Sequence, residues 1–406
     1  MKGIAWYRAA TRRQWKVLAA AALAWMLDGM NVTLYAFALT RIEREFGLSS
    51  AMAGAVASVT LLSSAAGGIA FGYLADRLGR TKALGIAILA YSVFTWATAT
   101  AHSLAALLVW RLLVGLGMGG AWTAGAALVA EEWPAEHRGK AIGMVQSGWA
   151  VGYIAAALLS AWIVPAHGWR LLFAIGAMPA VLAVWIWRNI QEPEVWRTVR
   201  RSALPIRSLF TIPLLRTIGV ATALSSTLMF AYWGLFNWAP AYLSSPRENG
   251  GAGMSIVQSV AWIVPMQIGA FFGYTCFGFF ADRFGRRPAF VAFVLCAAFS
   301  VPVYGLFATS PTVLLLTGPL VGFFGHGYFS VFGVMLAELF PTGIRATAQG
   351  LCYNTGRGIG ALAPVTIGAI AGRNGIGIAL ACTSIFYVAG AALIYLLPET
   401  RGRELE

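Results

Sequence analysis

Three charged residues stand inside long apolar stretches of this sequence. Asp28 follows "LAAAALAWML", Arg111 lies within "LAALLVWRLLVGLGMGG", and Arg357 lies within "GLCYNTGRGIGALAP". A charged side chain in such surroundings costs kilocalories unless it is paired or protonated, so each of the three is a candidate functional group. A carboxylate can exchange a proton, and a guanidinium can bind a carboxylate through two parallel N–H donors. Reversible binding of protons and anions is therefore the chemistry that these residues could perform.

Asp28 and Arg111 are predicted to lie at the same depth in a membrane. With a helical rise of 1.5 Å per residue, Asp28 lies about 18 Å from Lys16 and Arg111 about 12 Å from Ser103, in a hydrocarbon core of about 30 Å. This predicts an Asp28–Arg111 ion pair that forms and breaks as a proton is taken up and released. The alternative is a static buried ion pair that fixes helix packing.

Arg357 has no acidic counterpart in the second half of the sequence at its own depth, about 16 Å from Ala346. An anion that comes and goes would satisfy such a guanidinium, whose planar fork fits a carboxylate. The residue therefore predicts an organic monocarboxylate as cargo. The alternative is that Arg357 bonds to backbone carbonyls or extends to water.

Other polar residues in the apolar stretches are weaker candidates. His326 is either a second proton carrier or substrate donor, or a hydrogen-bonded packing residue, and the sequence does not separate the two. Tyr232, Trp233, Trp238 and Trp122 are aromatic residues that could shape a pocket. The predicted substrate-binding residues beside Arg357 are Asn31, Tyr35, Gln146, Asn237, Gln267, Tyr353 and Asn354.

The elements that hold these residues are predicted to be membrane-spanning helices. The chain has 406 residues, 59% hydrophobic and 11% charged, with a mean hydropathy of +0.72. Runs of about 20 apolar residues suffice to cross a bilayer, and helices satisfy every backbone amide within the run. The sequence thus predicts an all-α membrane protein. The expected helices span residues 15–38, 51–74, 83–101, 104–130, 139–165, 169–190, 214–243, 256–280, 288–308, 312–337, 346–371 and 376–397.

The distribution of Lys and Arg predicts the orientation of these spans. Twelve spans place both termini on one side, and most of the 29 basic residues fall in loops on that side. By the positive-inside rule, both termini and the linker 191–213 are cytoplasmic, as in a bacterial-type inner membrane. The net charge of +14 is then mainly topological, and nucleic-acid binding is not expected. The predicted outer-side cations are Arg41, Arg44, Arg170, Arg247 and Arg373.

The sequence also repeats itself. "ADRLGR" at 75–80 recurs as "ADRFGR" at 281–286, "EEWPAEHR" at 131–138 as "ELFPTGIR" at 338–345, and "PE" at 193–194 as "PE" at 398–399. Three pairs at nearly one offset predict two homologous six-helix halves, 1–190 and 214–406.

The repeated segments carry charges that can hold the cytoplasmic face shut and be rearranged when the halves rock. The alternative is that they only set topology. The residues of this predicted cytoplasmic gate are Gly72, Asp76, Arg80, Glu131, Arg138, Asp282, Arg286, Glu338 and Arg345.

The segments "GYLADRLGRTK" and "GFFADRFGRRP" resemble the loop 2–3 and loop 8–9 signature of the major facilitator superfamily, and the resemblance covers essentially the whole chain. "LDGMN", "RLLVGLGMGGAW", "EEWPAEHRGKA", "HGWRLLFAIGAMPA", "YWGLFNWAPAYL" and "YNTGRGIGALAP" resemble the sialate:H+ symporters, a group that includes lactate-type permeases. Aromatic-acid:H+ symporters are similar too. These groups often carry "DGxD" in helix 1, where this chain has Asn31, and "PETRGREL" is similar to sugar porters. The resemblance implies that Asp28 and Arg111 take part in coupling.

The sequence therefore predicts a proton-coupled transporter that imports a lactate-, pyruvate- or sialate-like monocarboxylate by alternating access, and that acts as a monomer in the lipid bilayer. The alternatives are a proton-coupled sugar, polyol or aromatic-acid symporter, or a non-transporting sensor. Sensors on this scaffold commonly add a cytoplasmic extension, whereas this sequence ends nine residues after the last predicted helix. Without a P-loop, a nucleophile–base set or metal-ligand spacing, neither an enzyme nor a cofactor or metal site is expected.

Overall fold

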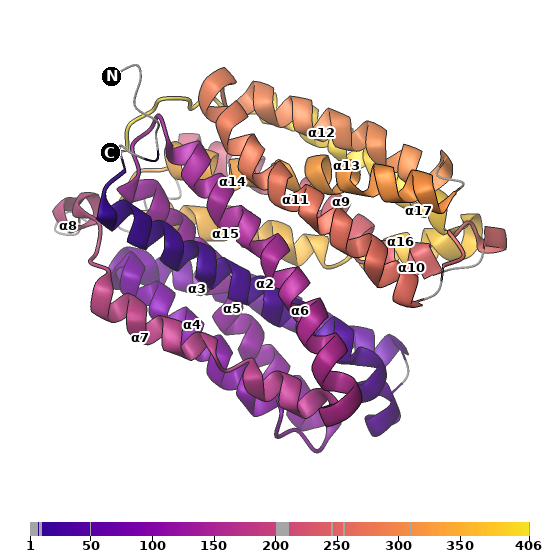
Figure 1. The fold of residues 1–406 in the computed structure, drawn as a ribbon. Helices are drawn as coiled ribbons and strands as arrows, with labels where there is room; N and C mark the ends of the chain where they lie inside the picture. Colours follow the sequence, from indigo (N-terminus) through magenta and orange to yellow (C-terminus); the bar gives the residue numbers. More distant parts are fainter. Residues whose placement is uncertain are drawn as a thin grey trace.

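A computed structural model describes residues 7, 10–48, 50–199, 211–244, 247–254, 256–307 and 310–405. The secondary structure of these residues is helical, with no strand among them. The helices form two bundles that lie side by side, one from the first half of the sequence and one from the second (Figure 1). The predicted all-α fold with two halves is confirmed.

Each predicted span of the N-terminal half is helical. The predicted break between helices five and six lies at Gly168, whose φ of 76° and ψ of 175° are not helical, so that two helical stretches meet there within α6. This helix ends at Ile175, and Pro179 then occupies the first turn of the next one, where its missing N–H costs nothing. The helices are α2 (Arg12–Phe46), α3 (Ser50–Leu78), α4 (Arg80–Thr98), α5 (Leu104–Glu132), α6 (Arg138–Ile175) and α7 (Pro179–Asn189).

The C-terminal half has helices at its six predicted spans as well, but several of them are divided. Pro240 and Pro364 each lie in the first turn after a break, because proline has no N–H with which to continue a helix. The elements are α9 (Ile212–Phe236), α10 (Ala239–Ser244), η3 (Arg247–Asn249), α11 (Ile256–Phe284), α12 (Arg286–Pro302), η4 (Val303–Phe307), α13 (Pro311–Gly327), α14 (Ser330–Leu339), α15 (Arg345–Gly360), α16 (Ala363–Asn374), α17 (Ile376–Cys382), α18 (Ser384–Leu393) and η5 (Ile394–Leu396).

Ten helical segments of the described chain are long and apolar enough to cross a membrane. The predicted spans 83–101 and 346–371 are not among the ten, although α4, α15 and α16 form there. In α15 the reason is its polar content, since it carries Arg345, Gln349, Asn354 and Arg357. A helix with these residues has to be shielded from lipid by its neighbours, and all four side chains are buried.

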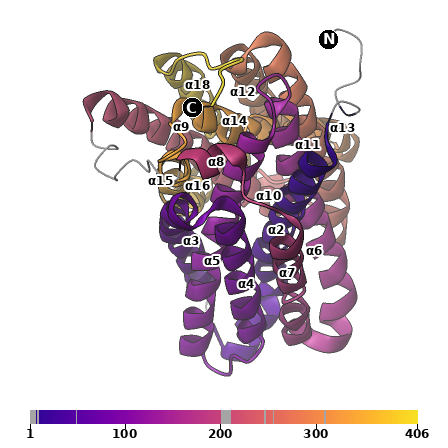
Figure 2. The same cartoon turned by 90° about the vertical axis from the view of Figure 1, so that its left-hand side faces the viewer.

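The two halves meet along two helix pairs, α3 with α15 and α6 with α11 (Figures 1 and 2). Glycines bring the backbones of these helices together. A Cβ atom added to Gly278 of α11 would lie 2.8 Å from the Cα of Lys140 in α6, and one added to Gly72 of α3 would lie 2.5 Å from the carbonyl oxygen of Ala346. The halves are therefore in direct backbone contact at the end of the molecule where α6 and α15 begin.

The start of α2 and the C-terminal segment after Leu397 lie at the same end of the molecule, together with α8 (Glu194–Val199) (Figure 1). This is the end at which the repeated charged segments of the two halves meet. Residues 200–210 of the predicted linker 191–213 lie outside the described residues. The assignment of this end to the cytoplasm stays a prediction.

Candidate functional site

A small cavity lies between the two halves, close to the middle of the long helices. Its volume is about 20 Å³, enough for about one water molecule. A bound organic molecule would need several hundred Å³, so the halves or their side chains have to move before cargo can enter. The residues lining this central cavity are Trp25, Gln146 and Trp149 from the N-terminal half and Met229, Tyr232, Trp233, Tyr274, Phe329, Tyr353 and Arg357 from the C-terminal half.

Arg357 is the charged residue of the central cavity. Its side chain is buried, and its Nη1 donates to Ser64 Oγ over 3.5 Å while Nε has no hydrogen-bond partner. The guanidinium carbon lies 5.5 Å from the ring centroid of Tyr353 and 5.9 Å from that of Trp25. Within the described chain, Arg357 forms no ion pair with a carboxylate, so its charge is left for another partner.

Asp28 is completely buried, and neither of its carboxylate oxygens has a hydrogen-bond partner among the described residues. Its electrostatic counterpart is Arg357 of the other half. The predicted Asp28–Arg111 ion pair is not formed here. The guanidinium carbon of Arg111 instead lies 5.0 Å from the ring of Tyr35 and 5.8 Å from that of Phe173.

The prediction of that ion pair failed because equal depth does not determine in which direction a side chain leaves its helix. Tyr35 follows Asp28 by seven residues, or about 10 Å along the helix axis. Arg111 contacts Tyr35 on that later turn of α2, whereas Asp28 lies within electrostatic range of Arg357 of the C-terminal half and of Tyr91 in α4. Arg111 therefore lies inside the N-terminal bundle, and its predicted role in coupling stays a prediction.

Two of the other predicted substrate residues line the central cavity. Gln146 accepts a hydrogen bond from Trp122 Nε1 over 3.1 Å. The ring of Tyr353 stacks on that of Trp122, with centroids 3.6 Å apart and planes 14° apart. Because Trp122 belongs to one half and Tyr353 to the other, this stack joins the two halves beneath Arg357.

The remaining predicted substrate residues lie outside the central cavity. Asn31 and Tyr35 are buried in the N-terminal bundle, and Asn237 is exposed after the last turn of α9. Asn354 donates to Thr123 Oγ1 and to the carbonyl of Gly350, which ties the two halves together. Gln267 lines a separate cavity of about 10 Å³ between α2, α6 and α11. Residue type predicted these positions, but helix rotation decides which side chains reach the cavity.

His326 is buried one layer behind the central cavity. Its Nδ1 lies 3.1 Å from the carbonyl oxygen of Gly322, and its Nε2 has no partner among the described residues. Its ring centroid lies 4.0 Å from that of Phe236 and 5.1 Å from that of Tyr232, a residue that lines the cavity. Its ring is thus packed and hydrogen-bonded, and it reaches the cavity only through its aromatic neighbours.

Five lining residues were not among the sequence candidates. An apolar or aromatic residue in a membrane helix gives no sign in the sequence that distinguishes cavity lining from packing. Only Trp25 had such a sign, because it precedes Asp28 by three residues and so shares a helix face with it. The five residues are Trp25, Trp149, Met229, Tyr274 and Phe329.

At one end of the molecule, the eight charged residues of the predicted gate form two buried clusters. In the first, Glu131 Oε1 lies 2.8 Å from both Arg80 Nη2 and Arg345 Nη1, and Asp76 lies 2.8 Å from Arg80 Nη1. Asp76 also accepts from the backbone N–H groups of Ala346 and Thr347. Arg345 and these amides belong to the C-terminal half, so the cluster bridges the halves.

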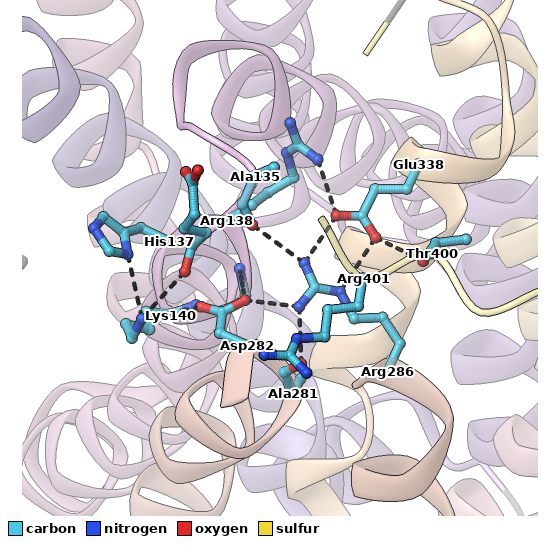
Figure 3. A network of polar contacts seen from close by, with 12 residues as sticks. Ala135, His137, Arg138, Lys140, Ala281, Asp282, Arg286, Glu338, Thr400 and Arg401 are labelled. Carbon is cyan, nitrogen blue, oxygen red and sulfur yellow. Dashed lines mark hydrogen bonds and ion pairs between the residues drawn. The ribbon is translucent and has the colours of Figure 1, made fainter. Parts of the chain in front are cut away.

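The second cluster, which Figure 3 shows, has the arrangement of the first with the halves exchanged. Glu338 Oε1 lies 2.8 Å from Arg286 Nη2 and 2.9 Å from Arg138 Nη1, while Asp282 lies 2.8 Å from Arg286 Nη1. Asp282 accepts from the backbone N–H groups of Gly139 and Lys140 at the start of α6. Each aspartate thus caps a helix of the opposite half, where a negative charge is favourable.

A further pair of glutamates stabilises the helices next to the clusters. Glu192 accepts from the backbone N–H groups of Thr81 and Lys82 at the start of α4, and Glu399 accepts from those of Arg286 and Arg287 at the start of α12. The repeat therefore pairs Glu399 with Glu192, 207 residues earlier, and not with Glu194 as the two "PE" dipeptides suggested. Glu131 and Glu338 are separated by the same 207 residues.

A two-half helical bundle with a charged cavity between the halves and a closed, charge-bridged end defines a membrane transporter that can work by alternating access. The chain belongs to the Major Facilitator Superfamily, whose family model matches residues 21–273 and 253–406. It is thus a multi-pass integral membrane protein and a secondary transporter, not an enzyme.

Several named relatives match nearly the whole chain. A probable 4-methylmuconolactone transporter of Cupriavidus pinatubonensis is 35% identical, over 99% of this chain and 94% of its own length. A cis,cis-muconate transport protein of Acinetobacter baylyi is 35% identical, over 93% and 91%. The sialic acid transporter NanX of Escherichia coli is 29% identical, over 97% and 95%.

Among solved structures, the proton:xylose symporter XylE bound to 6-bromo-6-deoxy-D-glucose has the same fold. The TM-score is 0.81, and the match covers 97% of this chain and 98% of the other. The identity is 19%, so this likeness concerns the fold alone.

Proposed function

We propose that this transporter carries a planar organic acid, aromatic or unsaturated, together with a proton. The observation that carries the proposal is the position of Arg357: a buried guanidinium in the central cavity, without a carboxylate ion pair among the described residues. A carboxylate that binds there would satisfy both the charge and the free Nε donor.

The walls of the cavity favour an aromatic or unsaturated acid over the predicted lactate-like cargo. Seven of the ten lining residues are aromatic, and flat rings stack well on a flat, conjugated guest. Lactate is too small and too polar to use such walls. The names of the muconolactone and muconate relatives agree with this choice, which was the aromatic-acid alternative from the sequence.

Asp28 is the proposed proton carrier. When ionised, it is the counter-charge of Arg357 across the halves. A substrate carboxylate on Arg357 would replace that counter-charge, and the ionised Asp28 would then face a second anion. Proton uptake by Asp28 removes this repulsion, so binding of the acid and binding of the proton favour each other.

The gate clusters supply the alternating access. Both clusters and both aspartate caps exist only while the gate end is closed, because each joins groups from the two halves. We assign this end to the cytoplasm on the basis of the positive-inside rule. Cargo that enters from the opposite face together with a proton, down an inward proton gradient, leaves after the clusters separate, and import is the direction that we propose.

Transport by purified protein in proteoliposomes tests the proposal. We expect an inwardly directed proton gradient to drive accumulation of radiolabelled benzoate or cis,cis-muconate, with lactate and xylose carried far more slowly. Arg357→Gln should abolish accumulation, and Arg357→Lys should reduce it because an ammonium lacks the bidentate fork. Benzoate uptake that is unchanged in Arg357→Gln would contradict the carboxylate role, and binding without exchange would identify a sensor.

A further inference from the structure

Four of the eight polar side chains that line the central cavity, Arg357, Trp25, Trp149 and Trp233, can only donate hydrogen bonds. The inference drawn from these donors rests on the proposed function. It concerns the part of the cargo that lies away from its carboxylate. The guanidinium of Arg357 and the indole N–H groups of Trp25 and Trp233 can only donate. Nε of Arg357 and Nε1 of both tryptophans are buried and have no partner among the described residues.

Gln146 is fixed as a donor too. An amide can present either its oxygen or its NH₂ group, but the indole of Trp122 is a donor only. The oxygen of Gln146 must therefore be the atom that accepts from Trp122 Nε1, and the bond measures 3.1 Å. The NH₂ group of Gln146 is left to serve the cavity.

These donors come from both halves. Arg357 on α15 and Trp233 on α9 belong to the C-terminal half, whereas Trp25 on α2 and Gln146 on α6 belong to the N-terminal half, so a cargo held by Arg357 meets further donors from the opposite half. No acidic side chain lines the cavity in the part of the chain that the structure describes. The tyrosine hydroxyls there can either donate or accept, so they do not alter the balance.

We infer that this transporter selects acids that carry a second acceptor oxygen, such as a ketone, lactone or second carboxylate, opposite the carboxylate that binds Arg357. A buried donor without an acceptor costs free energy, and a ligand that supplies the acceptor removes that cost. A ligand with a donor in the same place meets another donor and is rejected. Gln146 is the specificity-determining residue, and Trp122 is the residue that orients it.

Binding of shape-matched ligands to the purified full-length protein tests this inference. Acetylbenzoate and isopropenylbenzoate have nearly the same shape, but only the acetyl group has an acceptor oxygen. With the meta or the para isomers, we expect isothermal titration calorimetry to give about tenfold tighter binding of the acetyl compound. Aminobenzoate, which offers a donor, should bind more weakly than either. Equal affinities for the acetyl and isopropenyl compounds would overturn the inference.

Two variants attribute the preference to particular residues. Gln146→Leu should reduce the acetyl preference to near unity, while Trp122→Phe should release the amide so that it can turn its oxygen to the cavity and admit aminobenzoate. A preference that survives in Gln146→Leu would assign the selectivity elsewhere and defeat the inference.

The proposed function and the inference about a second acceptor can fail independently of each other. Benzoate itself, which lacks the second acceptor, reports on Arg357 alone. The neutral pair acetophenone and isopropenylbenzene repeats the comparison without a carboxylate, so the preference for an acceptor is measured whether or not Arg357 binds an acid.

Discussion

At the scale of single residues, the two buried charges near the central cavity come from different halves of the molecule. Asp28 belongs to the first half of the chain and Arg357 to the second, and the structure brings them together without closing an ion pair between them. Such an arrangement leaves each charge open to exchange, Asp28 for a proton and Arg357 for an anion. A closed salt bridge would have been a packing element, and its buried partners would be costly to separate.

Asp28→Asn tests whether Asp28 takes up and releases the coupled proton. The amide cannot ionise, so we expect a proton gradient to no longer drive accumulation of benzoate, while exchange of benzoate across the membrane continues. Binding of benzoate should also become independent of pH, because the anion that competes for Arg357 is gone. Counterflow and gradient-driven uptake, measured in the same proteoliposomes, separate the two effects. Accumulation by Asp28→Asn at the rate of the unaltered protein would show that the proton is carried elsewhere.

At the scale of the helices, one arrangement recurs: a carboxylate accepts hydrogen bonds from backbone N–H groups in the first turn of a helix. Asp76 and Asp282 cap helices of the opposite half, whereas Glu192 and Glu399 cap helices of their own half. The first pair can exist only in the closed arrangement, and the second pair can persist through the transport cycle. The "PETRGREL" segment thus has a structural role through Glu399.

Glu399→Gln tests the cap of α12. Burial opposes ionisation of Glu399, but the backbone N–H groups of Arg287, Arg286, Arg401 and Thr400 outweigh it and hold the pKa below its usual 4.5. A carboxylate with a lowered pKa stabilises the fold fully above about pH 4.5, and that stabilisation is lost as the pH falls through the pKa of the folded state.

We therefore expect Glu399→Gln to cost about 1 kcal/mol of unfolding free energy at pH 7, or roughly 2 °C in thermal unfolding. The difference from the unaltered protein should shrink below pH 4.5. Glu404→Gln, in the same exposed tail, is the matched control and should have no effect. A difference that stays constant down to pH 3 would mean that the charge of Glu399 is unimportant.

Glu131→Gln tests the bridge between the halves. Glu131 holds Arg80 of its own half and Arg345 of the other, and removing one partner from a buried ion pair costs about 3 kcal/mol. Because only the closed state contains this bridge, we expect the first turn of α15 to exchange its amide hydrogens faster in hydrogen–deuterium exchange.

Glu132→Gln is the matched control for that measurement. Its partner Arg13 lies in the same half, so the change should not speed exchange at α15. Equal rates of amide hydrogen exchange in α15 for Glu131→Gln and Glu132→Gln would refute the proposed bridge between the halves.

At the scale of the whole molecule, closure of the gate end depends on glycines as much as on charges. A Cβ atom on Gly278 would lie 2.7 Å from the carbonyl carbon of Gly139 and 2.8 Å from Lys140 Cα, both backbone atoms that cannot move aside alone. The steric condition for closure is therefore met only by the smallest residue at this position.

Gly278→Ala should prevent full closure and favour the state that is open at the gate end. Spin labels at Arg77 and Arg283, exposed on opposite halves, report the change in a background without the four free cysteines. We expect double electron–electron resonance to show a larger population of long distances. Gly219→Ala is the control, since a Cβ there meets nothing within 4 Å. Identical distance distributions for Gly278→Ala and Gly219→Ala would contradict the steric argument.

The sequence alone determined the helical bundle and its two halves, and it predicted which charged residues gather at one end. Long apolar runs can only be helices in a membrane, and the recurrence of "ADRLGR" as "ADRFGR" marks equivalent loops regardless of how the helices pack. Charges in such a sequence are few, so Asp28, Arg111 and Arg357 are conspicuous without any structure.

The tertiary structure decided what each of these residues faces. Helical rise gives the depth of a side chain but not its azimuth, which is why Arg111 was expected to meet Asp28 and instead meets Tyr35. For the same reason, the aromatic walls of the central cavity could not be told from ordinary packing. The donor state of Gln146 is set by Trp122, 24 residues away in the chain. Which side chains share a site depends on how helices rotate against one another, and that is fixed only when the two halves are assembled.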